Sequence, residues 1–468
     1  MHALRLPREL ADADTLFARL PEGERFWLDG SAMQAEMLPE MLPEMQPETR
    51  PESQSDLHAK LRPQVHPEGR WSFVGARPAA VRRVAFGEAD PWGWLDVLAS
   101  PNDAIAGDQG APRTSEVPWW VGYIAYDAAW SSPSRLGLRA PRRLPRSELP
   151  ILWMGRFESL FAIDHVRGGG FVLAPSKQEC DREIASLVER REPQARAGPL
   201  QIDPPDQHRR AILRALEAIA AGEIYQVNLA RRFRAAYEGS TLPLWRRMRA
   251  ASPVPLGLYL EAIDHAVLAR TMERFLRWEK DSRTIVTCPI KGTIARAGDD
   301  AREHASLRAD DKERAEHSMI VDLMRNDLSR IAELGTVEVE NALRVEPFAK
   351  LSHLVSTVRA RTKNGVGLGA ILDATFPPGS ITGTPKLRAM ELIEELEPHA
   401  RGVYTGTVGY VDRAGGLSLA VAIRTAVVHE NEATYFAGGG LVSASDPDRE
   451  IAETDLKARV FLDALEEM

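Results

Sequence analysis

Short apolar runs separated by turn residues dominate the first half of the chain and predict β-strands. The clearest runs are Trp71–Gly75, Ala80–Phe86, Trp119–Asp127, Leu152–Phe157 and Ser159–Asp164, with a glycine-rich turn at 167–170 before a further run at 171–173. The aromatic cluster of Trp119, Trp120, Tyr123 and Tyr126 is more typical of a sheet core than of a ligand site. The spacing predicts strands joined by tight turns, as in antiparallel sheets.

The second half mixes helical and strand patterns. An amphipathic helix is predicted over residues 206–221 and is followed by a strand over 224–233. Longer helical patterns cover residues 301–334 and 446–467. Residues 193–205 hold four prolines and one glycine, which predicts a linker between an N-terminal region and a C-terminal region.

Residues 36–53 repeat a four-residue unit that contains proline and glutamate. Proline at this density prevents both a regular helix and a strand ladder. We therefore predict that residues 31–66 form a mostly disordered insertion in a surface loop. A proline-rich docking site for a partner is the alternative.

Composition narrows the class of protein. The chain has 468 residues, a net charge of −8 and only two cysteines. These values disfavour nucleic acid as the main partner, and they exclude a disulfide framework and cysteine-rich zinc sites. The N-terminus lacks the apolar segment of a secretory signal, and no apolar run is long enough to span a membrane. The expectation is a cytoplasmic enzyme or binding protein.

One lysine is a candidate for chemistry because small residues follow it at a predicted strand end. Lys291 lies between Ile290 and the pair Gly292 and Thr293. Gly292 would let a ligand approach the backbone, and Thr293 adds a hydroxyl group. Burial beside Ile290 would lower the pKa of the lysine and expose a nucleophilic amine. The alternative is an ordinary exposed lysine.

The strand predicted over residues 224–233 carries polar side chains on one face. Gln226 and Asn228 alternate with Val227 and Leu229. A solvated face is the simplest explanation, and a polar binding surface inside a large domain is the alternative.

A strand predicted over residues 417–428 places an arginine among alanines. Arg424 is flanked on its face by Ala422 and Ala426, which leaves room beside the guanidinium for a planar anion. A guanidinium binds a carboxylate with two parallel hydrogen bonds. Tyr404, on the preceding strand, is placed to join it. A plain surface arginine is the alternative.

Two predicted helices each offer two carboxylates three residues apart, hence on one face. Glu313 and Glu316 form the first pair, and Glu450 and Glu453 form the second, with Lys457 on the same face. Four carboxylates with no histidine or cysteine at coordinating spacing suit a hard cation such as Mg²⁺. Two solvated helix faces are the alternative.

Two glycine-rich stretches, residues 375–386 and 436–442, lie between these helices. The first leads into a helix near Pro385, whose N-terminus would favour an anion. Neither stretch fits the P-loop or the dinucleotide-binding glycine pattern, so nucleotide binding is not expected.

Taken in this order, the motifs resemble those of the chorismate-binding enzymes, and the resemblance is closest to members of the aminodeoxychorismate synthase component I type. It covers residues 205–468 densely and the N-terminal half weakly. The motifs that carry it are Gln226–Ala230, Pro289–Thr293, Glu316–His317, Val321–Leu328, Leu351–Ser356, Pro377–Lys386, Arg401–Gly406, Gly438–Gly440 and Glu450–Lys457.

The resemblance implies an α+β fold of the anthranilate synthase component I type, in which mostly antiparallel sheets form a β-sandwich core with helices outside. It also implies two regions: residues 1–195, the N-terminal region of such enzymes, and residues 205–468, the chorismate-binding catalytic domain.

The resemblance further implies roles for individual residues. Lys291 would be the nucleophile, Glu273 the general acid, and His353 a neighbour of the reacting ring. Glu316 and Glu453 would hold Mg²⁺, with Glu313 and Glu450 around them. The substrate-binding residues would be Gln226, Gly292, Thr293, Tyr404, Arg424, Gly438, Gly439, Gly440 and Lys457.

Three reactions are open to such a chain. Relatives that add water to chorismate carry a lysine where this chain has Gln226, which disfavours isochorismate and salicylate synthases. Anthranilate synthases usually carry a small residue where Lys291 stands. The expected reaction is therefore conversion of chorismate and ammonia to 4-amino-4-deoxychorismate, in the biosynthesis of para-aminobenzoate and folate. Anthranilate synthesis and a non-catalytic chorismate-binding role are the alternatives.

Partners follow from what the chain lacks. No cysteine lies in a glutaminase motif, so ammonia is expected from a glutamine amidotransferase subunit or from solution. A separate aminodeoxychorismate lyase is expected to act on the product. Thr271 and Met272 stand where the family usually has Ser-Pro, which puts the position of the Glu273 loop in question. Tryptophan binding in the N-terminal half occurs among relatives and stays open.

Overall fold

The structure is a computed structural model that describes residues 1–30, 70–88, 90–98, 104–107, 110–131, 148–191, 194–296, 300–347, 351–466 and 468. The insertion predicted at residues 31–66 lies outside the described residues.

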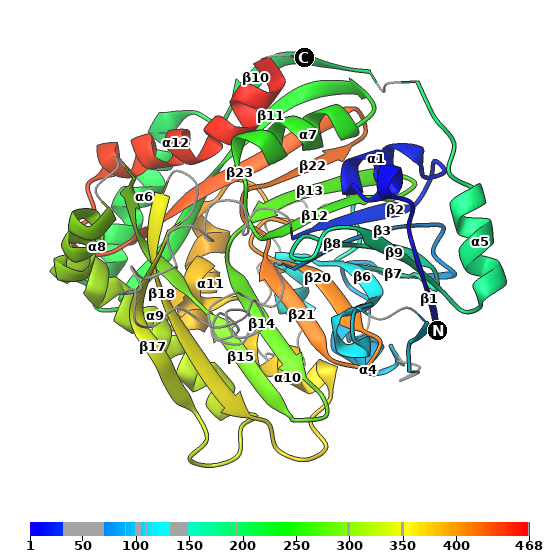
Figure 1. Ribbon diagram of the computed structural model, residues 1–468. Coiled ribbons are helices and arrows are strands. Elements are labelled where there is room, and N and C mark those ends of the chain that lie inside the picture. The colour runs from blue at the N-terminus through cyan, green and yellow to red at the C-terminus, as the bar shows by residue number, and fades with distance from the viewer. Residues whose placement is uncertain are drawn as a thin grey trace.

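Two large sheets organise the described chain (Figure 1). In order, the larger sheet contains β10 (Ala195–Ile202), β11 (Gln226–Gly239), β23 (Glu432–Leu441), β22 (Thr425–His429), β13 (His265–Thr271), β12 (Leu256–Glu261), β2 (Arg25–Asp29), β3 (Trp71–Ala76), β8 (Leu160–Asp164), β9 (Gly170–Ala174), β1 (His2–Arg5) and β5 (Ala106–Gly107), with β19 (Gly383–Thr384) paired to β11. The smaller sheet contains β16 (Ile290–Ala295), β18 (Leu351–Arg361), β15 (Thr284–Cys288), β14 (Arg274–Glu279), β21 (Leu417–Val421), β20 (Thr407–Asp412), β6 (Pro118–Ile124), β7 (Leu152–Arg156) and β4 (Ala80–Val84), with β17 (Glu338–Pro347) paired to β18. The described strand pairs are antiparallel apart from β1 with β5.

The two sheets pack face to face over a shared apolar core. Phe26, Phe73 and Leu258 of the larger sheet lie in the same buried cluster as Val121 and Trp153 of the smaller sheet. Inward residues of two stacked sheets are expected to interdigitate in this way. The predicted antiparallel β-sandwich core is confirmed, and so is the aromatic run around Trp119 as sheet core.

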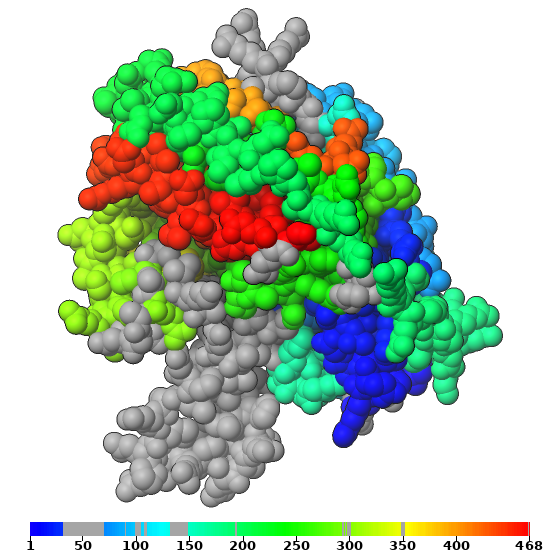
Figure 2. Space-filling view, turned by 90° about the horizontal axis from the view of Figure 1, so that it is seen from above, coloured from blue at the N-terminus to red at the C-terminus, as the bar shows by residue number. Residues whose placement is uncertain are grey.

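Helices cover the outer faces of both sheets. On the larger sheet lie α1 (Ala13–Arg19), α5 (Lys177–Ala185), α7 (Leu242–Ala251) and α12 (Pro447–Glu466), with α6 (Pro205–Ala220) and α11 (Lys386–Leu396) against β11. On the smaller sheet lie α4 (Pro91–Asp96), α9 (Asp311–Ser329) and α10 (Leu368–Thr375), while α8 (Asp300–Ala309) packs against β17 and β18. Figure 2 shows α12, in red, running across the surface of the molecule. None of the described helices is long and apolar enough to cross a membrane.

The expected linker at residues 193–205 is wrong. Residues Ala195–Ile202 form β10, which pairs with β11 and has a register shift between Ala197 and Leu200. A strand at a sheet edge tolerates Pro199 because one row of its backbone groups needs no partner. Strands from residues 1–195 and from residues 205–468 share both sheets.

The helical stretch expected over residues 301–334 consists of two helices, α8 and α9, because Asp310 forms an N-terminal cap for the second one. Its carboxylate accepts a hydrogen bond from the backbone N–H of Glu313 at 3.0 Å, the usual way to satisfy a free donor at a helix N-terminus. Helix α9 therefore begins just before Glu313, and it carries Glu316 one turn further on.

The single strand expected over residues 417–428 is also wrong. Strand β21 ends at Val421 in the smaller sheet, and β22 begins at Thr425 in the larger sheet. Between them, Arg424 adopts a φ of 51°, in the left-handed region that non-glycine residues rarely enter. The alternation of Arg424 with alanines therefore spans a break at which the chain passes from one sheet to the other.

A buried ion pair fixes the turn after α11. Arg401 donates to both carboxylate oxygens of Glu397, at 2.9 and 2.6 Å, and to the backbone oxygens of Ile381 and Asn228 at 3.0 and 2.7 Å. A carboxylate oxygen of Glu397 also accepts from the backbone N–H of Ala230 at 2.9 Å. One pair of side chains thus joins α11, β11 and the loop before β19.

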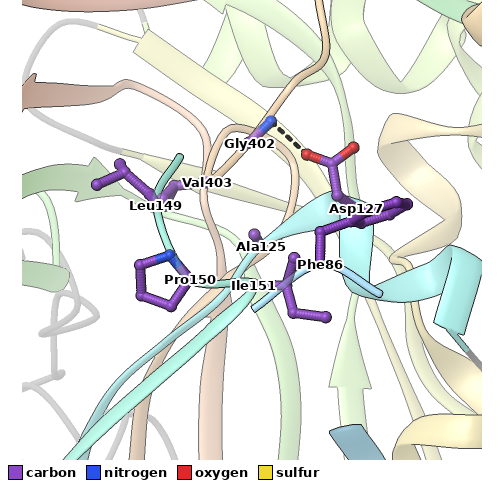
Figure 3. A pocket seen from close by; sticks show the side chains of 8 residues that line it. All are labelled: Phe86, Ala125, Asp127, Leu149, Pro150, Ile151, Gly402 and Val403. Carbon is purple, nitrogen blue, oxygen red and sulfur yellow. Dashed lines mark hydrogen bonds between the residues drawn. The ribbon is translucent and has the colours of Figure 1, made fainter. Parts of the chain in front are cut away.

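The N-terminal half supports the same turn from the other side. Gly402 donates its N–H to Asp127 at 3.0 Å, and its carbonyl accepts from Tyr126 N–H at 2.8 Å. Beside this contact lies a cavity of about 10 Å³ (Figure 3), about the volume that one water molecule needs. Its lining residues are Phe86, Ala125, Asp127, Leu149, Pro150, Ile151, Gly402 and Val403.

Candidate active site

The polar face of β11 is buried, which overturns the simplest explanation that it is solvated. Gln226 is 1% exposed and Asn228 is 7% exposed. Asn228 pairs with Gly440 on β23, and Ala230 pairs with Gly438. The face of β11 that carries Gln226 and Asn228 therefore lies beside a stretch of strand that has no side chains.

Lys291 lies at this glycine stretch. A Cβ atom placed on Gly440 would lie 2.8 Å from Nζ of Lys291 and 2.7 Å from Nε2 of Gln226. Carbon atoms do not approach nitrogen that closely without a bond, so glycine is required there for the lysine and glutamine to occupy these positions. The lysine is half-buried on β16, and the alternative of an ordinary exposed lysine at a strand end is wrong.

The residues after Lys291 link it to α9 and β18. Gly292 has a φ of +73°, and a Cβ there would lie 3.2 Å from a carboxylate oxygen of Glu313. Thr293 pairs with His353 in the backbone ladder, and the side chain of Thr293 lies outside what the structure describes. Nδ1 of His353 is 3.3 Å from the carbonyl oxygen of Gly292, which fixes Nδ1 as the protonated nitrogen.

His353 is uncharged near neutral pH. Burial, opposed by the hydrogen bond to Gly292 and reinforced by the charges of Arg424 and Lys457, lowers the pKa of His353 to about 4. A buried imidazole of this kind offers a neutral polar surface to a ligand.

Glu273 is the buried acid of the site. It lies between β13 and β14 and is 5% exposed. Burial raises its pKa to about 7, against the Ser380 hydroxyl and the Lys291 charge, which lower it. The hydroxyl of Thr271 accepts a hydrogen bond from the Glu273 N–H at 3.2 Å, so the unusual threonine itself holds this loop.

The four glutamates face each other from α9 and α12. Burial is the main cause that raises the pKa values of Glu313, Glu316 and Glu450. Glu453 adds to the increase at Glu313, and Glu450 adds to that at Glu316, so the two helices interact electrostatically. Within the described residues, no three carboxylate, histidine or cysteine side chains lie close enough together to hold a metal ion.

Their donor chemistry nevertheless suits a hard cation. One carboxylate oxygen of Glu450 is buried and has no hydrogen-bond partner among the described residues, while the other accepts from Ser445 at 2.7 Å. That unpartnered oxygen is 2.9 Å from where a Cβ of Gly439 would lie. All four side chains would coordinate a metal ion through oxygen atoms, which are the ligands that Mg²⁺ prefers.

Lys457 completes the α12 side. Its ammonium group donates to the carbonyl oxygen of Gly438 at 2.8 Å and pairs with Glu453 at 2.6 Å. Burial lowers the pKa of Lys457 although Glu453 opposes the change. Burial would raise the pKa of Glu453, but Lys457 together with the charges of Lys291 and Lys312 leaves that pKa below its usual value.

Tyr404 and Arg424 lie near the site. Among the described residues, no hydrogen bond joins their side chains. Tyr404 stacks on Phe436 of β23 with ring centroids 5.4 Å apart. The charge of Arg424 contributes to the lowered pKa values of His353 and Lys457. Tyr404 therefore lies beside β23 and the charge of Arg424 acts on His353 and Lys457, but the two residues do not form the pair that a shared sheet would give.

The candidate residues therefore converge on Gly438–Gly440 from several elements: Gln226 from β11, Lys291 from β16, and Glu450 and Lys457 from α12. The resemblance assigned no role to Asn228, although it lies two positions from Gln226 on the same polar strand face. It also missed Arg401 and Glu397, whose i, i+4 spacing is compatible with an ion pair.

Comparisons with known proteins agree with this geometry. The sequence model of the chorismate binding enzyme family matches residues 60–463. Anthranilate synthase component 1 of Streptomyces coelicolor is 35% identical over 429 residues, which are 85% of this chain and 81% of that protein. Aminodeoxychorismate synthase component 1 of Salmonella typhimurium is 42% identical over 249 residues, which are 53% of this chain and 54% of that protein.

The match to anthranilate synthase component 1 of Aquifex aeolicus, at 41% identity, likewise spans only 52% of that protein's length. Among solved structures, anthranilate synthase component I from Streptococcus pneumoniae superposes with a TM-score of 0.72 at 25% identity, over 91% of this chain and 97% of that one. The menaquinone-specific isochorismate synthase of Escherichia coli superposes with a TM-score of 0.68 at 19% identity, over 99% and 94%, and shows the fold alone.

The buried acid generates a prediction about stability. Because the folded-state pKa of Glu273 is about 7 and the ordinary value is 4.5, the native chain should lose stability as the pH rises between these values. Glu273→Gln has no charge to bury, so its free energy of unfolding should exceed that of the native chain by up to about 3 kcal/mol at pH 8. Urea unfolding at pH 4.5 and pH 8 measures the difference.

The matched control is Glu279→Gln, an exposed glutamate on β14, which should change stability little at either pH. An effect of Glu273→Gln that is the same at both pH values would contradict the buried ionisable acid.

Proposed function

The chain belongs to the chorismate-binding enzyme family, and we propose that within it the protein acts as an aminodeoxychorismate synthase component I. It would convert chorismate and ammonia to 4-amino-4-deoxychorismate and retain the enolpyruvyl group. The observation that carries the proposal is Lys291, whose amine lies beside Gln226 and Gly440 in the same site as a buried acid.

The proposed reaction has two displacements. The neutral amine of Lys291 forms a bond to ring C2, the ring double bonds shift, and the C4–O bond breaks. Ammonia then forms a bond to C4, the double bonds shift back, and the C2–N bond to Lys291 breaks. The hydroxyl leaves as water, and the net change is replacement of the C4 hydroxyl by an amino group.

Glu273 is suited to the first displacement. A carboxyl group whose pKa is about 7 is half protonated at neutral pH, close to the optimum for a general acid. It would give its proton to the leaving hydroxyl. His353, neutral and hydrogen-bonded to Gly292, would contact the ring without adding charge.

Mg²⁺ is proposed as the cofactor, held by Glu316 and Glu453 with Glu313 and Glu450 around them. When bound, it would neutralise a carboxylate of chorismate. Among the chain's own residues, Lys457, Tyr404 and Arg424 would hold the remaining carboxylate oxygens, and the Gly438–Gly440 backbone would lie against the substrate. Lys457 already donates to Gly438, so its ammonium group is positioned at that backbone.

A partner subunit would supply ammonia. Relatives of this chain carry the name component 1, and we propose a glutamine amidotransferase as a further component here. A separate aminodeoxychorismate lyase would then release pyruvate in the route to para-aminobenzoate and folate.

Anthranilate synthase is the second candidate because relatives of that name are as similar as the others. The position of Lys291 favours the first candidate. A direct attack of ammonia at C2 needs no amine from the protein, whereas the lysine amine lies inside the site.

The function is tested by identifying the product. Incubation with chorismate, Mg²⁺ and ammonium chloride should yield 4-amino-4-deoxychorismate without pyruvate, measured by chromatography and mass spectrometry. Stoichiometric pyruvate together with fluorescent anthranilate would instead establish the second candidate.

The covalent role has its own control. Native protein quenched with chorismate in the absence of ammonia should carry an adduct on the peptide that contains Lys291, and Lys291→Ala should not. Undiminished product formation by Lys291→Ala would limit the lysine to a binding role.

The metal proposal predicts that Glu316→Gln lowers turnover at least about 100-fold and weakens Mg²⁺ binding measured by calorimetry without substrate. Stability without Mg²⁺ should hold or rise, because the variant removes repulsion between like charges. Asp322→Asn, an exposed change on the same helix, is the control. Unchanged Mg²⁺ binding by Glu316→Gln would remove this residue from the metal site.

A further inference from the structure

We propose that Asn228, together with Gln226, forms the pocket that holds the ammonia molecule beside Lys291. The inference rests on the proposed function in that it takes ammonia as a substrate, and it assigns a role to Asn228, to which the resemblance gave none.

The first observation is a pair of buried acceptors without partners. Oε1 of Gln226 and Oδ1 of Asn228 have no hydrogen-bond partner among the described residues, although these residues are only 1% and 7% exposed. An unsatisfied buried acceptor costs about 1–3 kcal/mol, and native proteins leave few of them. Two of them two residues apart, on one face of one strand, point to a ligand that supplies donors.

The second observation is that the backbone of β23 approaches these groups closely because it carries no side chains there. A Cβ on Gly440 would lie 2.7 Å from the side-chain amide nitrogen of Gln226 and 2.8 Å from Nζ of Lys291. A Cβ on Gly438 would lie 3.0 Å from Oδ1 of Asn228. Gly438 and Gly440 lie two residues apart on one face of β23, so the bare backbone of this strand lies directly against both amides and the lysine.

The third observation is that Asn228 is held by its backbone and not by its side chain. Its N–H donates to the carbonyl of Thr382 at 2.8 Å, and its carbonyl accepts from Arg401 at 2.7 Å. The side-chain oxygen contributes nothing to these contacts. The buried Arg401–Glu397 pair thus fixes where the amide lies and leaves the amide itself for a ligand.

Ammonia matches these groups chemically. It has three N–H donors and one lone pair, so two N–H groups can bond to the two amide oxygens while the lone pair faces the ring. The neutrality of the acceptors matters, because a carboxylate would favour the ammonium ion, which has no lone pair to donate. Two neutral amides bind the nitrogen without stabilising its unreactive form.

The test is steady-state kinetics of Asn228→Ala with ammonium chloride as the nitrogen source, measured as consumption of chorismate. Loss of one hydrogen bond should raise the KM for ammonium about three- to tenfold, while the KM for chorismate changes less than about twofold. The Lys291 adduct formed without ammonia should be undiminished, because the first displacement does not use the pocket. Asn228→Ser serves if the alanine variant does not fold.

Two further variants sharpen the result. Asn228→Asp should lower kcat and move the pH optimum for ammonia upward, since a carboxylate favours ammonium. Arg234→Ala removes a side chain on the same strand whose partner is Glu432, and it should change neither KM.

An equal rise in the KM for chorismate would assign Asn228 to the substrate's hydroxyl and overturn the proposal, as would an unchanged KM for ammonium. Chorismate consumption is counted whichever product forms, so product identification tests the proposed function separately from this pocket.

Discussion

The buried ion pair between Arg401 and Glu397 is the constraint on which the geometry of the site depends. Both side chains are almost fully buried, at 1% and 4% exposure, and together they bind the backbone of β11 at Asn228 and Ala230. Removing one member of such a pair typically costs 3–5 kcal/mol, because the other charge stays buried without its partner. The polar face of β11 is therefore held in register with the turn that carries Tyr404.

The same register places the glycine stretch of β23. Because β11 and β23 are adjacent antiparallel strands, fixing Asn228 and Ala230 also fixes Gly440 and Gly438 opposite them. Lys291 and Glu450 then approach the bare backbone from two different elements. A side chain on any of the three glycines would collide with a polar atom of the site, so the absence of side chains there is what lets β11, β16 and α12 meet.

How far the sequence predicts this arrangement depends on the range of the interactions. Local patterns predict the strands around Trp119 and the helix that carries Glu450, since each depends on periodicity within a few residues. Glu273 is indicated only by the resemblance to the family, because no local pattern shows that its carboxyl group is buried. The break at Arg424 was not predictable, because a change of sheet is decided by packing and leaves the apolar alternation intact. The partner of Arg401 at Asn228 is 173 residues away, and no spacing rule reaches that far. The prolines of residues 193–205 predict a linker, but residues Ala195–Ile202 form strand β10 because the edge of β11 is available for pairing.

The charge of Lys291 acts on several carboxyl groups of the site. That charge lowers the pKa values of Glu273, Glu313, Glu316 and Glu453. In the proposed reaction the lysine attacks as a neutral amine. Loss of its charge would remove this lowering, so Glu273 would hold its own proton more firmly. The reactive combination, a neutral amine with a protonated carboxyl, contains as many protons as the charged combination. In the proposed reaction, a proton transfer between the two side chains would therefore give the reactive combination without net uptake of protons from solvent. A ligand that excludes water would shift the balance toward the neutral pair, because burial disfavours both charges. Binding of the substrate would in this way prepare both groups together.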